Sequence, residues 1–309
     1  MLDRAALAWD RSWLAILEIS PSALPELADY DRMQTGLVPA YARRWPALRD
    51  VPFCLAVGDG AAANVGSGST DPATIALTVG TTAALRVIVL GEPPPVPPGL
   101  WGYRLDAGHH ILGGATSEGG NIFRWARATL ALPNDADIEA ELERRAPDAH
   151  GLTFLPLLGG ERSPGWVGGA TGSVAGLRLS TQPLDILQAA LEGVALRLAL
   201  IARQLGAVVA DDAQLMAGGG ALAASPAWAQ MIASALNRPL ARLAEAEITA
   251  RGAAILALRA LGRCGLSDHP PAIAQMIHPI PDQTAALRRA LERQVALYQK
   301  LVADPAMRG

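Results

Sequence analysis

Hydrophobic runs broken by turn residues predict several strands in the first half of the chain. Apolar runs at 73–79 (ATIALTV) and 83–90 (AALRVIVL) flank the turn Gly80-Thr81-Thr82, which predicts an antiparallel hairpin. A shorter run at 53–57 is stopped by a glycine and predicts a buried strand. After a proline-rich loop, residues 104–112 predict one more strand.

Helical periodicity dominates the second half. Residues 184–205 repeat apolar side chains with a period of 3.6 over several turns, which predicts a long helix. Ser225 and Pro226 are typical of an N-cap followed by the first helical residue. The pattern also predicts a short strand at 213–217 and helices at 10–17, 25–28, 118–130, 137–145, 226–236, 247–261 and 283–302. Strands followed by helices, with one late strand, favour an α/β fold.

Composition and charge exclude several classes of protein. The 309 residues are half hydrophobic, which is enough for one large core or two modest ones. A net charge of −3 gives no electrostatic footprint for nucleic acid or an anionic membrane. No apolar run reaches the roughly 18 residues of a membrane span, and the first residues do not resemble a signal peptide.

Cysteine and histidine usage adds two expectations. Cys54 and Cys264 lie far apart in the chain and are expected to be reduced thiols, which favours a cytoplasmic location. The five histidines form no HExxH motif and the cysteines form no CxxC motif, so we expect no metal site made by the protein alone.

Three glycine-containing turns follow apolar runs and are the candidates for chemistry. They are Gly58-Asp59-Gly60, Gly80-Thr81-Thr82 and Gly218-Gly219-Gly220-Ala221. Backbone N–H groups exposed in such turns bind phosphate oxygens, because no side chain blocks close approach. Any one of them is more often a plain turn, but together they suggest a phosphoryl-transfer cleft. No P-loop motif occurs, and no GxGxxG lies in a βαβ setting.

Asp59 is the only charged residue in the stretch VGDGAAANVGSG, which we interpret as a loop. A general base needs a carboxylate that can reach a substrate hydroxyl, and no Lys, Arg or His within the stretch would pair with it. The alternative is an Asx-turn acid that only satisfies its own loop.

Five other polar or aromatic residues have simpler interpretations. Arg162, in GERSP, is expected to form a structural ion pair in preference to contacting substrate, and Asn121 is not expected to contact a ligand. Glu192 is expected to be a packed or capping partner on its helix, and Trp125 and Trp228 to be core or shielding aromatics.

These stretches, in order, resemble the FGGY carbohydrate kinases of the actin-like (ribonuclease H-like) ATPase fold. VGDGAAANVGSG resembles the family's catalytic segment, and IALTVGTTAALRV resembles its strand–turn–strand at the β- and γ-phosphates. LTFLPLLGGERSPGW is similar to the signature of the second lobe, and LMAGGGALAASPAW to the adenosine-binding turn. Within the family, GDGAAANVGSG and SEGGNIFRW look most like the gluconokinase branch.

The resemblance implies an α/β lobe with a central mixed sheet flanked by helices, and ATP and Mg²⁺ as cofactors. It implies that Asp59 is the general base and that Gly58 and Asp59 contact the sugar. It also implies a cofactor-binding set made of two turns: Gly80, Thr81 and Thr82 at the transferred phosphates, and Gly218, Gly219, Gly220 and Ala221 at the adenosine.

The chain departs from the family in lacking the DxGT turn that opens the first lobe. We therefore interpret residues 1–68 as the C-terminal remnant of the first, sugar-binding lobe and residues 69–309 as the second, nucleotide-binding lobe. Residues 1–50 are then expected to be poorly anchored or recruited into self-association. Smaller departures at Ala224, Ser234 and Asn237 lower the expected nucleotide affinity.

The expected function is ATP-dependent phosphorylation of a sugar or sugar acid, such as gluconate or a ketose, incomplete without the DxGT-bearing lobe. The alternative is a non-catalytic nucleotide-binding or interaction module derived from such a kinase. A third interpretation, an actin-like ATPase without a sugar substrate, is disfavoured by the GERSP segment and the GDG turn. A separate N-terminal lobe or a second copy of the chain is the expected partner.

Overall fold

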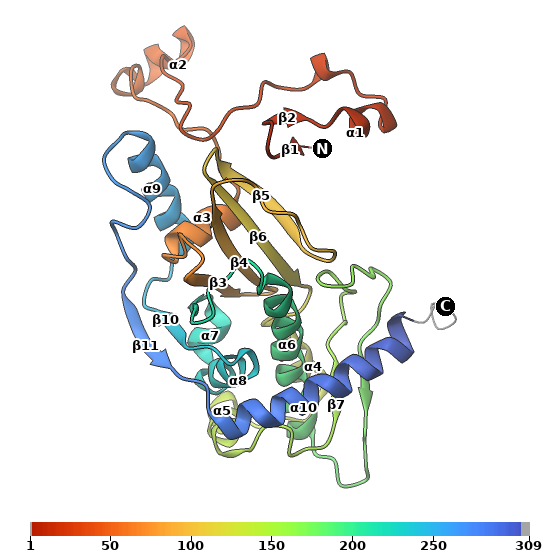
Figure 1. Cartoon of the computed structure of the whole chain (residues 1–309). Coiled ribbons are helices and arrows are strands. Elements are labelled where there is room, and N and C mark those ends of the chain that lie inside the picture. Colours follow the sequence, from red (N-terminus) through yellow and green to blue (C-terminus); the bar gives the residue numbers. More distant parts are fainter. Residues whose placement is uncertain (1, 304–309) are drawn as a thin grey trace.

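A seven-stranded mixed sheet forms the centre of the molecule in the computed structural model, which describes residues 2–303 (Figure 1). The strand order is β11-β10-β9-β3-β4-β6-β5. Strands β3, β9 and β10 are parallel to one another, and the remaining neighbours are antiparallel. The bounds are Thr74–Val79 (β3), Ala83–Leu90 (β4), Trp101–Asp106 (β5), His109–Thr116 (β6), Gln214–Gly218 (β9), Leu240–Leu243 (β10) and Ile273–Ile277 (β11).

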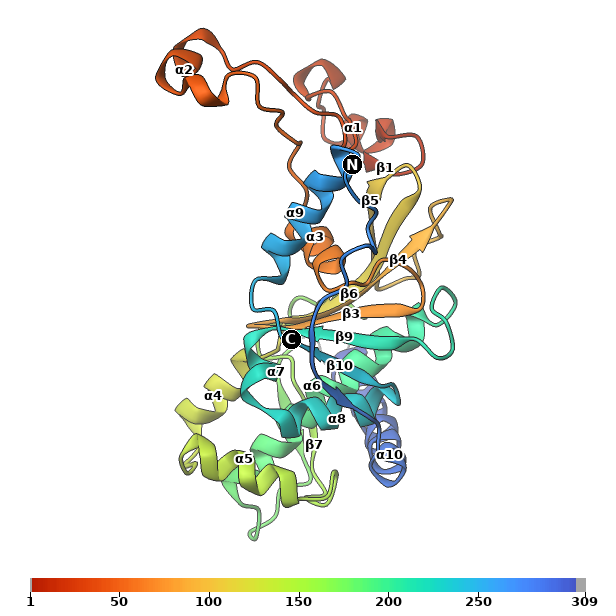
Figure 2. The ribbon, with the colours of Figure 1, turned by 90° about the vertical axis from the view of Figure 1, so that its left-hand side faces the viewer.

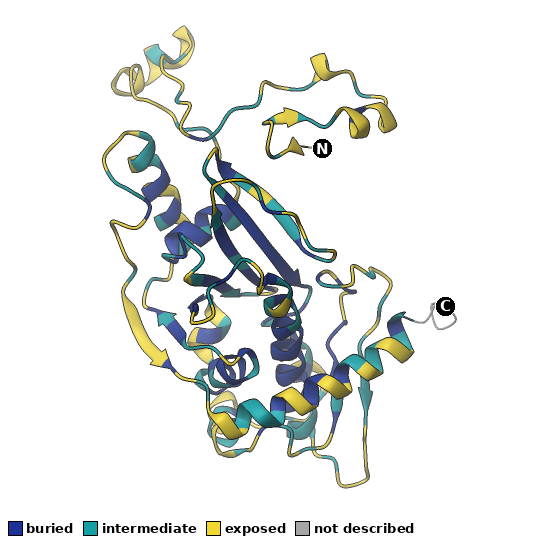
Figure 3. Ribbon diagram, viewed as in Figure 1, coloured by how far each residue is buried: buried dark blue, intermediate teal, exposed yellow. Residues whose placement is uncertain are grey.

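Helices cover both faces of the sheet, as Figure 2 shows. Alternate side chains of β3 and β4, such as Leu77 and Leu85, pack with α6 (Pro183–Leu205) and α8 (Pro226–Leu236) in the main core. Ile88 and Ile111 point the other way, toward α3 (Asp59–Gly66) and α9 (Ile248–Ala260). The other elements from residue 117 onward are α4 (Asn121–Thr129), α5 (Asp135–Arg144), β7 (Thr153–Leu155), β8 (Ser173–Ala175), α7 (Gly220–Ala224), α10 (Pro281–Tyr298) and a π-helical end (Gln299–Ala303). The buried sheet and α6 stand out in Figure 3.

Helix α6 starts where its sequence indicates. Pro183 is its first residue, and Gln182 and Asp185 form a reciprocal capping box. Most of α6 is buried, because it lies between the sheet and α8. Trp228 of α8 is 2% exposed, and its indole N–H donates to the carbonyl of Leu191 at 3.0 Å, which satisfies its one polar atom.

Two glycines let α3 and α9 cross in backbone contact. A Cβ on Gly66 would lie 1.9 Å from the carbonyl oxygen of Ile248, and one on Gly252 would lie 1.8 Å from that of Ala62. Any side chain at either position would force the helices apart. Although α3 falls within the expected first-lobe remnant, it therefore packs closely on the body of the protein.

Residues 2–53 extend away from the sheet (Figures 1 and 2). They hold only short elements: β1 (Leu2–Asp3), β2 (Ala8–Trp9), α1 (Arg11–Ile16), η1 (Pro21–Ala23), α2 (Pro39–Arg44) and η2 (Pro46–Leu48). Arg104 of β5 anchors the segment through two 2.8 Å hydrogen bonds to the Asp29 carboxylate, and Arg259 of α9 donates to the Tyr30 hydroxyl at 2.8 Å. Residues 31–53 have no buried member, so the attachment of this segment is local.

The strong periodic signals are confirmed. The hairpin of β3 and β4 pairs Val79 with Ala83, and Ser225 caps α8 by accepting from the Trp228 N–H at 3.2 Å. The predicted helices at 184–205 and 247–261 form within two residues of their expected ends. None of the helices within residues 2–303 has both the length and the hydropathy that a membrane span requires.

Several local predictions are wrong. The predicted strand at 53–57 does not form, because this run pairs with no strand of the seven-stranded sheet and makes only an isolated bridge between Phe53 and Gln34. Residues 25–28 are irregular, and the short helix lies earlier, at Pro21–Ala23. Residues 104–112 span two strands, β5 and β6, because Asp106 accepts a hydrogen bond from the Gly108 N–H and turns the chain.

Candidate functional site

Two of the predicted glycine turns meet at one edge of the sheet. Strands β3 and β9 are parallel and in register, with Thr78 opposite Gly218, so the turns that follow them lie side by side. Gly219 has φ +109°, and a Cβ on it would lie 2.3 Å from the carbonyl oxygen of Val79. Only glycine allows this conformation and this approach.

A third turn, at the end of β6, joins them and was not identified as part of the site from the sequence. The Gly120 N–H donates to the Gly80 carbonyl at 2.6 Å, and a Cβ on Gly119 would lie 2.5 Å from the carbonyl carbon of Thr82. Asn121 holds this turn, since its side chain accepts from the Gly119 N–H at 2.8 Å. The sequence did offer a signal for this turn, since Gly119 and Gly120 closely follow the apolar run that forms β6.

This edge presents donors suited to phosphate oxygens. Within residues 2–303, the N–H groups of Thr81, Thr82 and Gly219 donate to no backbone carbonyl in a turn or loop, and the side chains of both threonines are solvent-exposed. A Cβ at Gly80 or Gly220 would meet nothing within 4 Å, so there is open space in front of the turns. Unpaired N–H groups around an open space are the arrangement by which backbone binds anions.

Asp59 is the first residue of α3, and its carboxylate is exposed. The stretch predicted as a loop is therefore a helix, because Ala61, Ala62 and Ala63 favour helical backbone after Gly58. Asp59 Oδ1 accepts only from the Gly60 N–H at 2.7 Å, and Asp59 forms no ion pair with a described residue. Together with Gly58 and Gly60 it lines a cavity of about 600 Å³ that reaches Tyr30 and Tyr103.

A cation nevertheless lies close to Asp59, contrary to the expectation drawn from the neighbouring sequence. The guanidinium of Arg86, on β4, sits behind Gly60, where a Cβ would be 3.2 Å from its Nε. Its Nη1 donates to the Thr78 hydroxyl at 3.3 Å, two residues before Gly80. Arg86 thus links the start of α3 to strand β3, which ends in the turn Gly80-Thr81-Thr82.

A buried polar network supports the loop at 157–163. Glu161 and Arg197 form an ion pair whose side chains are 1% and 3% exposed, and the Tyr298 hydroxyl donates to Glu161 at 2.6 Å. Glu118, beside the third turn, is 1% exposed and accepts from the Gly159 N–H at 2.7 Å. Burial raises the pKa of Glu118 to about 7, against hydrogen bonds from backbone N–H groups that lower it.

Among the individual residues that were expected to have structural roles, the prediction is confirmed for some and wrong for one. Glu192 is a packed partner, as expected, accepting from the Asp148 N–H at 3.1 Å and pairing with His150. Trp125 packs its edge against Phe154. The structural ion pair expected for Arg162 is absent from the described part of the chain, and this side chain is exposed.

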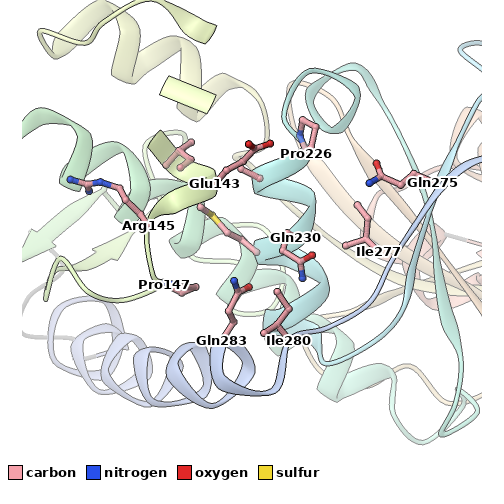
Figure 4. Close-up of a pocket in the computed structure, with 12 residues that line it drawn as sticks. Glu143, Arg145, Pro147, Pro226, Gln230, Gln275, Ile277, Ile280 and Gln283 are labelled. Atoms are coloured by element: carbon pink, nitrogen blue, oxygen red, sulfur yellow. The ribbon is translucent and has the colours of Figure 1, made fainter. Parts of the chain in front are cut away.

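Another cavity, of about 250 Å³, lies apart from these turns, between α5, α8, β11 and the start of α10 (Figure 4). Glu143, Arg145, Gln230, Gln275 and Gln283 supply most of its polar lining. No residue of the predicted site lines it. The described residues also contain no group of three His, Cys, Asp or Glu side chains placed to hold a metal ion.

The mixed sheet flanked by helices has the actin-like ATPase fold of the FGGY carbohydrate kinases. The chain belongs to this family, because residues 75–261, more than half of its length, match the C-terminal domain of the FGGY family of carbohydrate kinases.

Particular relatives agree with that assignment. The chain is 29% identical over 330 residues to a gluconokinase of Bacillus licheniformis, covering 97% of this chain and 64% of the relative. It superposes with a TM-score of 0.89 on a ligand-bound xylulose kinase and, equally, on a gluconate kinase, both from Lactobacillus acidophilus. Each of these is 29% identical, with 99% of this chain and 63% of the other chain covered. The chain therefore spans somewhat less than two thirds of the relatives it matches.

Proposed function

We propose that this chain carries the nucleotide-binding part and the general base of an ATP-dependent kinase that phosphorylates a hydroxyl of a sugar or sugar acid. The observation that carries the proposal is the unpaired, exposed carboxylate of Asp59, bordering a cavity on the same sheet whose edge gathers the glycine turns.

Asp59 has the features that a general base requires. Its carboxylate forms no ion pair with the residues that the structure describes, so one oxygen can accept the proton of an attacking hydroxyl. Gly58 and Gly60 on either side carry no side chain that would block a sugar, and a Cβ on Gly58 would meet nothing within 4 Å. The proton would move from the hydroxyl to Asp59 as that oxygen attacks the terminal phosphorus of ATP, whose bond to the bridging β–γ oxygen breaks so that ADP leaves.

The turns would hold ATP. Backbone donors at Thr81 and Thr82 would contact the transferred phosphates, while Gly219, Gly220 and Ala221 would lie against the adenosine. Mg²⁺ is expected to enter with ATP and to be held mainly through phosphate oxygens, because the described residues offer no preformed cluster of ligands. When bound, the ion would neutralise charge on the transferred phosphate.

A complete cleft would need the part of the relatives that the chain does not match. We propose that residues 69–309 are the nucleotide-binding lobe and that residues 1–68 belong to the first lobe, whose remaining part closes over Asp59. Residues 2–53 expose large apolar side chains that such a lobe would cover: Trp13, Ile16, Leu17, Val38, Tyr41, Trp45, Leu48, Val51 and Phe53. A homodimer and a cytoplasmic location stay predictions.

The test is ATP-dependent phosphorylation of gluconate, xylulose and glycerol by the wild-type chain and by Asp59→Asn. Both are assayed alone and with the part of the Bacillus licheniformis gluconokinase that the chain does not match. We expect turnover of at least one acceptor in the combined assay, and loss of about 10²- to 10⁴-fold in Asp59→Asn with an unchanged melting temperature. Asp212→Asn, an exposed carboxylate outside the site, is the matched control.

The second candidate, a non-catalytic nucleotide-binding module, is favoured by the partial coverage of the relatives. Calorimetry with MgATP separates the two. Nucleotide binding with no turnover of any acceptor, even in the combined assay, would support the module and reject the kinase.

A further inference from the structure

Arg86 is a half-buried cation with no carboxylate partner among residues 2–303. Its Nε is buried without a hydrogen-bond partner in the described structure, and the only described side chain to which the guanidinium donates is the neutral hydroxyl of Thr78, through Nη1. Burial is the main cause that lowers the pKa of this guanidinium. Placing an unpaired charge in a poorly solvated site is unfavourable unless an anion joins it.

The charges around Arg86 leave the site with a positive excess. Tyr103 and then Asp59 act on Arg86 electrostatically without bonding to it, and Arg162 opposes them from the loop after β7. Arg162 is exposed and also has no carboxylate partner in the described residues. Around Arg86, two guanidinium groups are therefore balanced by one carboxylate and a neutral phenol, and that carboxylate must itself stay free if it is to act as a base.

The position of Arg86 favours an acceptor group over the phosphates of ATP. Arg86 lies behind Gly60, one residue from Asp59 and on the face of the sheet covered by α3. The unpaired N–H groups suited to phosphates lie beyond the strand ends, at Thr81, Thr82 and Gly219. A molecule whose hydroxyl contacts Asp59 would bring its other substituents to the guanidinium.

We infer that Arg86 binds the carboxylate of a sugar-acid acceptor whose hydroxyl is presented to Asp59. This assignment rests on the kinase function proposed above and names its acceptor class as a polyhydroxy acid. A guanidinium binds a carboxylate through charge-assisted hydrogen bonds, whereas a neutral polyol leaves Arg86 uncompensated. Arg86 is then the residue that selects acids over neutral sugars, with Arg162 adding to the local positive charge.

The experiment compares D-gluconate with D-glucitol, which carries a hydroxymethyl group in place of the carboxylate. Both are titrated calorimetrically, in the presence of MgADP and of the part of the Bacillus licheniformis gluconokinase that the chain does not match, into the wild-type chain, Arg86→Gln and the matched control Arg178→Gln, an exposed arginine outside the site. We expect the wild type and the control to prefer gluconate. In Arg86→Gln the gluconate affinity should fall by about 10- to 100-fold while the glucitol affinity stays unchanged.

Thermal unfolding of the same variants separates recognition from a structural role. Because Arg86→Gln breaks no ion pair and removes an uncompensated charge, its melting temperature should be equal to or above that of the wild type. A structural arginine would give a lower melting temperature and weaken both ligands.

Three results would overturn the inference: no gluconate binding to the wild type, no preference over glucitol, or an equal loss for both ligands in Arg86→Gln. The proposed function fails differently, through absence of phosphorylation of every acceptor. If glycerol or xylulose is phosphorylated but Arg86→Gln does not selectively lower the gluconate affinity, the proposed kinase function stands and the role of Arg86 is rejected.

Discussion

Replacing Glu118 by glutamine should make the protein more stable at neutral pH and leave it unchanged near pH 4.5. Glu118 is 1% exposed, and burial raises its pKa from 4.5 to about 7. Below pH 4.5 the carboxyl is protonated in both the folded and the unfolded chain, so its burial costs little. Between pH 4.5 and 7 only the unfolded chain releases the proton, and the folded state loses stability as the pH rises.

The size of the effect follows from that difference in pKa. Each pKa unit corresponds to about 1.4 kcal/mol, so the full loss is about 3 kcal/mol and is complete above pH 7. Glutamine carries no charge at any of these pH values, and its amide oxygen can still accept from the Gly159 N–H. The difference in free energy of unfolding, Glu118→Gln minus wild type, should therefore rise by about 3 kcal/mol between pH 4.5 and pH 8.

Urea unfolding at half-unit pH steps from 4.5 to 8 measures this difference directly. Other titrating groups, including Asp106 and His110, are present in both proteins and cancel in the subtraction. Glu143→Gln, an exposed glutamate on α5, serves as the control and should differ from the wild type by the same small amount at every pH. A difference for Glu118→Gln that stays constant across this range would refute the assignment of a raised pKa to Glu118.

Three further predictions concern backbone contacts and the attachment of the N-terminal segment. Gly66→Ala should lower the free energy of unfolding by about 1–3 kcal/mol or more in urea titrations, because its Cβ would meet the α9 backbone at 1.9 Å. The control Gly169→Ala, whose Cβ would enter open space, should leave the free energy of unfolding unchanged. Gly219→Ala should weaken MgADP binding by about 10-fold or more in calorimetry, since φ +109° and the contact with β3 displace the turn; equal affinity would exclude this turn from the site. Asp29→Ala should speed cleavage within 31–53 in limited proteolysis by removing the partner of Arg104, and an unchanged rate would show that this pair does not anchor the segment.

Local sequence signals located most of the regular elements and the candidate glycine turns. The periodicity of α6, the Ser225 cap and the turn between β3 and β4 act within a few residues, so the pattern alone locates them. The pattern also located the turns at Gly80-Thr81-Thr82 and Gly218-Gly219-Gly220, each at the end of an apolar run, but only the parallel pairing of β3 with β9 brings them together. Asp59 was identified from its bare surroundings, but its place at the start of a helix was missed because the flanking glycines are typical of a loop.

Tertiary structure alone decided the rest. The third turn at Gly119 and Gly120 reaches the site because β6 pairs with β4, and Arg86 reaches Asp59 because α3 crosses the sheet above β4. Glu118 has a raised pKa because a loop some 40 residues further on buries it. Burial, charge balance and cross-strand proximity arise between segments far apart in the chain, and the spacing of residues along a sequence carries no measure of them.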